Sequence, residues 1–208
     1  MTPSESFAGS GPQDAGGSIN RLQSLTAFRV RQRITPMVNR YEIREIAPDG
    51  SHGPVLALAQ QKRLALKEQV TFYADEARTQ PVFGFRARNV MDVSGTTDVF
   101  DAAGNQLGTF SKNFTASLLV STWHLDQPGH PRITGVERSL PIALIRRFIF
   151  EALPYHFDFR TPDGEMAISV DKKFSWGRDS YDVLIPHVGL DRRLVAALAL
   201  ALDALQAR

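Results

Sequence analysis

The chain has 208 residues, of which 43% are hydrophobic and 22% are charged. This length and composition predict one globular domain with a substantial core. The 24 basic and 22 acidic residues leave a formal charge of only +2, so no overall field favours nucleic acid, and we expect no such partner. Cysteine is absent, which excludes disulfides, thiolate metal sites and cysteine nucleophiles and is compatible with a reducing cytoplasm.

The first residues, MTPSESFAGSGPQDAGGS, are polar and rich in glycine, serine and proline. They lack the basic, apolar and small-residue regions of a secretory signal peptide. Their composition predicts a disordered tail over residues 1–24, followed by a single domain over residues 25–208.

Strand signals dominate the body of the chain. Two-residue alternation, or enrichment in β-branched and aromatic residues, predicts strands in five segments. These segments are FRVRQRI (28–34), YEIREI (41–46), VTFYA (70–74), TASLLVSTWHL (115–125) and YHFDF (155–159). Residues that tolerate turn geometry, such as the two PDG sequences, separate the strands.

One pattern repeats along the chain: a strand, an acidic turn, and a second strand that often ends in a basic residue. It occurs at residues 41–62, 70–89, 97–114 and 156–174. Asp49, Asp75 and Asp101 are 26 residues apart (75 − 49 and 101 − 75), which supports a repeat of hairpins. Asp163 follows Asp101 by 62 residues (163 − 101), so additional elements lie between the third and fourth hairpins.

The segment SLPIALIRRFIFEAL, residues 139–153, predicts a peripheral helix with Ser139 as its N-cap. One face of this helix is apolar, and Arg146 and Arg147 lie away from it. Phe150 lies among the polar residues. A phenylalanine beside arginines on a polar face is compatible with a membrane-surface anchor, so these three residues are candidate membrane contacts. Packing of Phe150 on a neighbouring loop is the alternative.

The C-terminal segment GLDRRLVAALALALDALQAR is predicted to form a helix at about residues 190–206. No polar residue occurs from Leu194 to Leu202, so the helix is apolar on every side and must be enclosed. A bilayer-spanning helix needs roughly 20 predominantly apolar residues, and this run is about half that length. We therefore expect the helix to be buried inside the protein.

Antiparallel hairpins have exposed edges, and closing the sheet into a barrel removes them. A barrel of about twelve strands has a lumen too wide for its own side chains to fill, because about eight strands already leave an interior that is just fillable. The prediction is a mainly β fold: a closed antiparallel barrel of about twelve strands that encloses the C-terminal helix. Asp191 and the following arginine pair are expected at one mouth of the barrel.

The order of elements resembles the superfamily of tubby C-terminal domains, phospholipid scramblases and plant LURP-one-related proteins. Residues Lys172–Leu205 are similar to the scramblase and LURP-one ending: a basic strand, an Asp-containing turn, a short apolar strand, a proline and an Asp-led hydrophobic helix. FRVRQRI and YEIREIAPDG are similar to the start of a LURP-one domain. The resemblance extends from Phe28 to the C-terminus. It implies a barrel with a central helix and permits phospholipid binding, because tubby domains bind phosphoinositide headgroups on the barrel surface.

The sequence departs from scramblases in the segment that those proteins associate with calcium. Asp179, Asp182 and Asp191 remain as calcium candidates, but His187 and Val188 stand within the acidic run. The lipidated cysteine cluster of scramblases is also absent. We therefore expect no bound metal.

Motifs for catalysis are absent from the sequence: there is no G-x-S-x-G elbow, no phosphate-binding loop and no H-E-x-x-H. The five histidines show no metal-ligand spacing, and their positions favour exposed loops and strand ends. A triad drawn from Asp182, His187 and a distant serine has no support beyond chance combination. We expect a protein that is not an enzyme and that uses no cofactor.

Basic rows are the strongest functional signal. Alternation in FRVRQRI places three arginines on one face and Phe28, Val30 and Ile34 on the other. Guanidinium groups bind phosphate bidentately, so converging rows would bind an anionic phospholipid headgroup. Basic residues on exposed strands also serve solubility and protect sheet edges, which is the alternative interpretation. The candidate headgroup-binding residues are Arg29, Arg31, Arg33, Arg86, Arg88, Lys172 and Lys173.

The functional prediction is a non-enzymatic barrel that binds anionic phospholipid or a membrane surface, located in the cytoplasm or peripherally at the membrane. Two alternatives remain. One is a scaffold for an unknown protein partner, which an exposed apolar patch around Trp123, Trp176 or Phe150 would favour. The other is a binder of a small apolar ligand, which requires free space between the C-terminal helix and the barrel wall. The excess of arginine (19) over lysine (5) indicates a GC-rich, bacterial coding sequence, in which phosphoinositide signalling is not expected.

Overall fold

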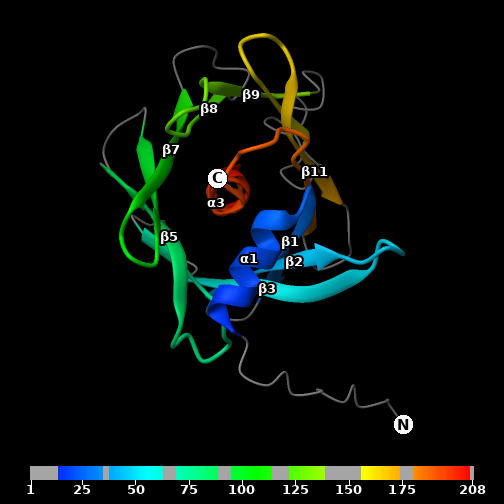
Figure 1. Ribbon diagram of the computed structural model, residues 1–208, viewed down its shortest axis with the longest axis vertical. Coiled ribbons are helices and arrows are strands. Elements are labelled where there is room, and N and C mark those ends of the chain that lie inside the picture. Colours follow the sequence, from blue (N-terminus) through cyan, green and yellow to red (C-terminus); the bar gives the residue numbers. More distant parts are fainter. Residues whose placement is uncertain are drawn as a thin grey trace.

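The computed structural model describes residues 14–34, 38–62, 69–88, 95–113, 122–138, 156–173 and 180–206. Twelve antiparallel strands form a closed barrel, and a helix runs through its centre (Figure 1). Each strand pairs with its neighbours in the chain, and β12 pairs with β1 to close the ring. This architecture confirms the predicted fold class.

The elements follow one another without crossovers in the sheet. Helix α1 (Ala15–Ser24) precedes the barrel and helix α3 (Arg192–Gln206) ends it. The strands are β1 (Ala27–Ile34), β2 (Val38–Ile46), β3 (His52–Lys62), β4 (Gln69–Tyr73), β5 (Pro81–Ala87), β6 (Thr96–Asp101), β7 (Gln106–Asn113), β8 (Thr122–Asp126), β9 (Ile133–Glu137), β10 (His156–Arg160), β11 (Met166–Lys173) and β12 (Ser180–Leu184).

All four predicted repeats are hairpins: β2–β3, β4–β5, β6–β7 and β10–β11. A fifth hairpin, β8–β9, lies between the third and fourth and accounts for part of the long interval before Asp163. The predicted strand at 115–125 is observed from Thr122, and its earlier residues lie outside the described part of the chain, as does the predicted helix at 139–153.

Three hairpins share one turn geometry, which begins at Ala47, Asp101 and Thr161. In each, this residue's N–H donates to the carbonyl four residues later, and a glycine three residues later donates back to its carbonyl. The three glycines have left-handed φ values of 79–86°, as in a three-residue loop with a bulge. Asp49 and Asp163 occupy a different turn position from Asp101, so the 26-residue aspartate spacing does not relate equivalent positions.

The core is formed between the inner wall and α3. Inward residues such as Phe28 and Val30 are fully buried, and Phe72 stacks on Phe83 with ring centroids 4.2 Å apart. Every residue of α3 from Leu194 to Leu202 is at most 3% exposed. A Cβ on Gly108 of β7 would lie 2.7 Å from Leu194 Cδ2, so the helix packs flush against this strand and leaves no space there for an apolar ligand.

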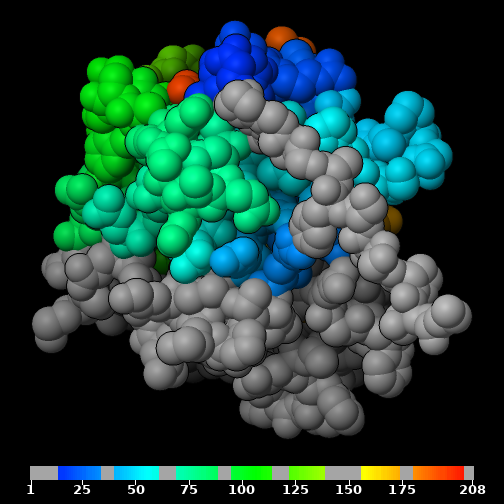
Figure 2. All heavy atoms as spheres, turned by 90° about the horizontal axis from the view of Figure 1, so that it is seen from below, coloured from blue at the N-terminus to red at the C-terminus, as the bar shows by residue number. Residues whose placement is uncertain are grey.

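Helix α1 corrects the prediction of a disordered tail, which is wrong for residues 15–24. The helix lies across the barrel mouth in Figure 1 and at one end of the barrel in Figure 2. Its Leu22 is fully buried against the core. The Gln23 side chain donates to Asp191 Oδ1 at 2.7 Å and accepts from the Arg192 N–H at 3.0 Å. The contacts that stabilise this polar, glycine-containing helix are therefore tertiary. Residues 1–13 lie outside the described part.

Candidate functional site

Several basic side chains gather on the outer surface of β1, β2, the start of β3 and the end of β11. We call it the basic face and define it by Arg29, Arg31, Arg33, Arg44, His52 and Lys173. The sequence places the β1 arginines outward because Phe28 and Val30 point into the core. The register then sets Arg29 opposite Asp182 and Arg31 opposite Glu42.

Glu42 lies at the centre of the basic face and is almost fully buried beneath the surrounding arginines. Its carboxylate accepts from Arg33 Nη1 at 2.9 Å and Arg44 Nε at 2.7 Å, and Arg31 Nη1 lies 3.9 Å away. Burial alone would raise the pKa of Glu42, but the bonds and charges of Arg44 and Arg33 outweigh it and hold the pKa below 4.5. Glu42 thus orders three arginines on one surface.

Replacing Glu42 with glutamine is expected to lower the free energy of unfolding by about 1–3 kcal/mol near neutral pH, because the arginines lose a charged acceptor. The folded-state pKa lies below the unfolded value, so this contribution is complete above about pH 4.5 and disappears as pH falls through the folded-state pKa. Urea unfolding at a series of pH values checks this. The wild-type protein should lose more stability on acidification than E42Q, whereas the exposed variant E76Q should behave like wild type.

Arg29 and Asp182 form the second ion pair of the basic face. Arg29 donates from Nε to Oδ1 at 2.6 Å and from Nη2 to Oδ2 at 3.0 Å, and its Nη1 donates to the Gly50 carbonyl at 3.0 Å. The bond to Asp182 raises the pKa of Arg29. Lys173 Nζ lies 3.6 Å from the same carboxylate. Three hydrogen bonds therefore hold Arg29 in place. The side chains of Arg29 and Arg31 are less exposed than those of Arg33 and Lys173.

The basic face keeps an excess of positive charge after these pairs are counted. Four arginines and Lys173 face two carboxylates, which leaves +3 (5 − 2) with His52 neutral. The pKa of His52 is lowered by burial first and then by Arg31, Arg29 and Arg44, and Glu42 opposes them only in part. Three arginines of the basic face thus lie close enough to His52 to disfavour its charged form.

Not all predicted basic residues join this face. Arg86 and Arg88 belong to β5 and its end, separated from β3 by β4. Lys172 points to the inner side, where its Nζ lies 5.7 Å from the ring centroid of buried Tyr181. Consecutive strand residues point to opposite faces, so grouping Lys172 with Lys173 was wrong. The candidate membrane contacts Arg146, Arg147 and Phe150 lie outside the described residues.

Two of the three calcium candidates, Asp182 and Asp191, bind arginines. Asp182 binds Arg29, and Asp191 binds Arg193 Nε at 3.0 Å and its backbone N–H at 2.9 Å. Asp179 lies outside the described residues. Over the ranges that the structure describes, no three His, Asp or Glu side chains form a group suited to a metal ion.

Two members of the basic face were missed by sequence reasoning. Arg44 follows Glu42 by two residues in YEIREI, so both side chains point to the same outer face. The two-residue alternation of a strand could therefore have predicted Arg44. His52 could be placed only after the β2–β3 register was known.

Trp123, one candidate centre of an exposed apolar patch, is 1% exposed and points into the core. Trp176 lies outside the described residues.

Fold and surface together define a class: closed single-domain barrels whose lumen is filled by their own apolar helix. The chain belongs to the LURP-one-related family, whose model matches residues 55–203, and this family is part of the tubby-like and scramblase superfamily. A comparison with curated proteins found no match. Strands β1 and β2, which carry most of the basic face, precede the matched residues. Among the described helices, none has the length and apolar character needed to cross a bilayer.

Proposed function

We propose that this protein is a non-enzymatic barrel that binds the surface of an anionic phospholipid membrane through the basic face. The observation that carries the proposal is the excess of ordered guanidinium groups around His52. Arginine forks match the geometry of phosphate oxygens and bind them bidentately. Membership of a superfamily that includes lipid-handling barrels supports the same function.

The arrangement of the cations favours binding over a purely structural role. Arg33 and Lys173 are 38% and 59% exposed, so they can contact a headgroup without leaving the fold. Basic residues on outer strands usually protect the exposed edges of a sheet. That role does not apply here, because β12 pairs with β1 and closes the sheet. The exposed ends of Arg33 and Lys173 can therefore contact an external anion in addition to their carboxylate partners.

Sedimentation with vesicles tests the proposal. We expect binding to vesicles that contain phosphatidylserine, weak binding to pure phosphatidylcholine, and a loss of affinity as salt rises. The double variant Arg33→Gln, Lys173→Gln should bind about 30-fold more weakly, because each basic residue near an anionic surface contributes about 1 kcal/mol. Arg132→Gln, compared with Arg33→Gln alone, is the matched control for loss of one charge, since Arg132 is exposed but lies outside the basic face, one residue before β9.

A local readout distinguishes contact at the basic face from general adhesion. An anionic headgroup beside His52 stabilises the imidazolium ion, so its pKa, measured by NMR, should rise when phosphatidylserine-containing nanodiscs are added. Equal binding to neutral vesicles, salt-independent binding, or an equal loss in Arg132→Gln would contradict the proposal and favour a protein partner.

A further inference from the structure

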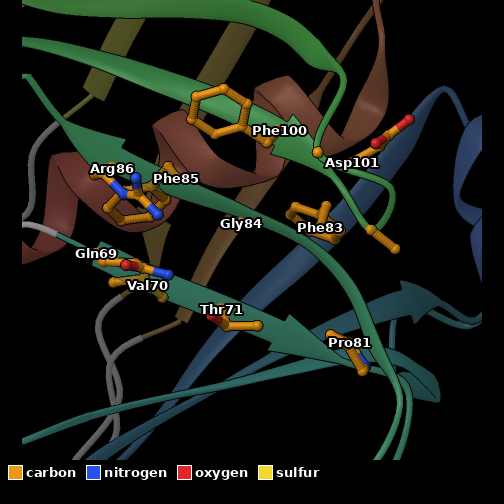
Figure 3. Close-up of a pocket in the computed structure, with 12 residues that line it drawn as sticks. Gln69, Val70, Thr71, Pro81, Phe83, Gly84, Phe85, Arg86, Phe100 and Asp101 are labelled. Atoms are coloured by element: carbon orange, nitrogen blue, oxygen red, sulfur yellow. The ribbon is translucent and has the colours of Figure 1, made fainter.

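A groove of about 340 Å³ runs over the outer surface of β4, β5 and β6, away from the basic face (Figure 3). Gln69 and Thr71 of β4 line one side, Phe100 of β6 lines the other, and Gly84 and Arg86 of β5 form the floor and one end. Its volume lies at the lower end of the range for small-molecule sites.

Gly84 creates the groove. Thr71, Gly84 and Phe100 are cross-strand neighbours, so the middle position of the row carries no side chain. A Cβ at Gly84 would lie 2.7 Å from the Val70 carbonyl oxygen, which no other residue accommodates without a backbone shift. Thr71 and Phe100 are two interstrand spacings apart, roughly 9–10 Å. Once side-chain radii are subtracted, the slot fits a body one ring or one hydrocarbon chain thick.

The next row of cross-strand neighbours contains a cation, Arg86. Arg86 lies between Gln69 and Asp98 in the sheet. Arg88 binds both oxygens of Asp98, with Nε at 2.8 Å and Nη2 at 2.7 Å, and Gln106 Nε2 donates to Oδ1 at 2.7 Å. Over the described ranges, Arg86 forms no ion pair. Arg88 thus occupies the carboxylate that would otherwise neutralise Arg86.

The acidic residue that lines the groove, Asp101, does not compete for Arg86. Asp101 accepts hydrogen bonds from the backbone N–H groups of Ala103 and Asn105 and from the Asn105 amide, so both oxygens are occupied by its own turn. These bonds, that of the Asn105 side chain foremost, lower the pKa of Asp101. Beside Arg86, the neutral donors Gln69 and Thr71 line the groove.

We propose that this groove binds a small carboxylate with a flat apolar body, of the aromatic carboxylate class. The carboxylate accepts a bidentate pair of hydrogen bonds from Arg86, and the Gln69 amide donates a further bond. The ring lies over Gly84 against Phe100, where an offset or edge-to-face contact adds to the buried area. This site is independent of membrane binding, because it uses different strands and different cations.

NMR titration of the full chain with 3-phenylpropionate tests the proposal. We expect saturable shifts of the Gly84 and Thr71 backbone amides and of the Arg86 Nε–H. The neutral isostere 3-phenylpropanamide should bind about tenfold more weakly, because it lacks the charge that Arg86 recognises, and acetate should also bind weakly, because it lacks the ring. Equal affinity for the carboxylate and the amide overturns the proposal.

Three variants separate the site from an unspecific cation effect. Arg86→Gln should weaken binding of 3-phenylpropionate at least about tenfold. Arg88→Gln releases Asp98, which can then pair with Arg86, so affinity should fall by about twofold to fivefold although a more distant residue is changed. Asp98→Asn should retain the affinity. Thermal unfolding midpoints near wild type show that each variant is folded.

The affinities of the three variants for 3-phenylpropionate decide whether Arg86 binds the carboxylate. Unchanged affinity in Arg86→Gln, or equal losses in Arg88→Gln and Asp98→Asn, overturns the assignment of the anion to Arg86. Preference of the groove for a peptide ending in a free aromatic residue, with no saturable binding of 3-phenylpropionate, overturns the small-molecule class in favour of a protein terminus.

Discussion

Replacing Leu198 with aspartate is expected to prevent the chain from reaching its folded state. Leu198 is fully buried in the middle of α3, and the barrel surrounds the helix on every side (Figure 1). An ionised carboxylate there would lose its hydration without a partner. The loss in the free energy of unfolding would exceed about 5 kcal/mol. A whole domain is stable by only about 5–15 kcal/mol, so the loss is enough to unfold it.

A milder substitution makes this effect measurable. Leu198→Ala should fold but lose about 2–5 kcal/mol in the free energy of unfolding, from lost apolar contact and the remaining cavity. Leu184 provides the matched control, because it is 49% exposed on the outside of β12. Leu184→Asp should stay within about 0.5 kcal/mol of wild type in urea unfolding. Similar losses at both positions would contradict the enclosed helix.

Replacing Asp203 with alanine is expected to cost about 2–6 kcal/mol of folding free energy, because two buried hydroxyl groups lose their acceptor at about 1–3 kcal/mol each. Asp203 is buried near the C-terminal end of α3 and accepts hydrogen bonds from Tyr41 Oη at 3.0 Å and from the Tyr181 hydroxyl. Both tyrosines are buried, and Gln32 Nε2 donates to Tyr41 Oη at 3.4 Å. Removal of the carboxylate leaves two hydroxyl groups in the core without this acceptor.

Urea unfolding of three variants checks the role of Asp203. Asp203→Asn keeps an acceptor of similar shape and should lose clearly less stability than Asp203→Ala. Asp163→Ala, at an exposed turn position, should be close to wild type. If Asp203→Ala were as stable as Asp163→Ala, the tyrosine contacts would not stabilise the helix in the barrel.

These contacts hold the two ends of α3 in different ways. At the N-terminal end, Gln23 of α1 bonds to Asp191 and to the Arg192 N–H, and Arg192 Nε donates to the Leu25 carbonyl at 2.9 Å. At the other end, Asp203 bonds to β2 and β12. The apolar middle of α3 therefore contributes burial, and its two polar ends contribute hydrogen bonds to α1, the residue before β1, and strands β2 and β12.

Most of the barrel was predictable because its signals are local. Alternation in FRVRQRI depends only on the two-residue period of a strand, and the repeated hairpins depend on turn residues close to those strands. The β8–β9 hairpin was missed because its second strand, ITGVE, is short and carries a weak alternation signal. Helix α1 was missed because burial of Leu22 and the bonds of Gln23 stabilise it, and both arise from residues distant in sequence.

The candidate site was predictable only in part. Parity along β1 correctly placed Arg29, Arg31 and Arg33 together. Their partners were not predictable, since Arg29 and Asp182 are 153 residues apart and meet only because β12 closes the barrel against β1. For the same reason the sequence did not show that Arg86 lacks an ion pair within the described ranges, which depends on the pairing of Arg88 with Asp98 across β5 and β6.

The sequence by itself determined the face to which most side chains point and the need to enclose the last helix, because strand period and apolar content are properties of short segments. Tertiary structure alone decided which charges neutralise one another, which remain available to a ligand, and that α1 packs at one end of the barrel (Figure 1). Those outcomes depend on strand register and barrel closure. Both are set by the packing of all twelve strands around α3 at once, and no single segment contains that information.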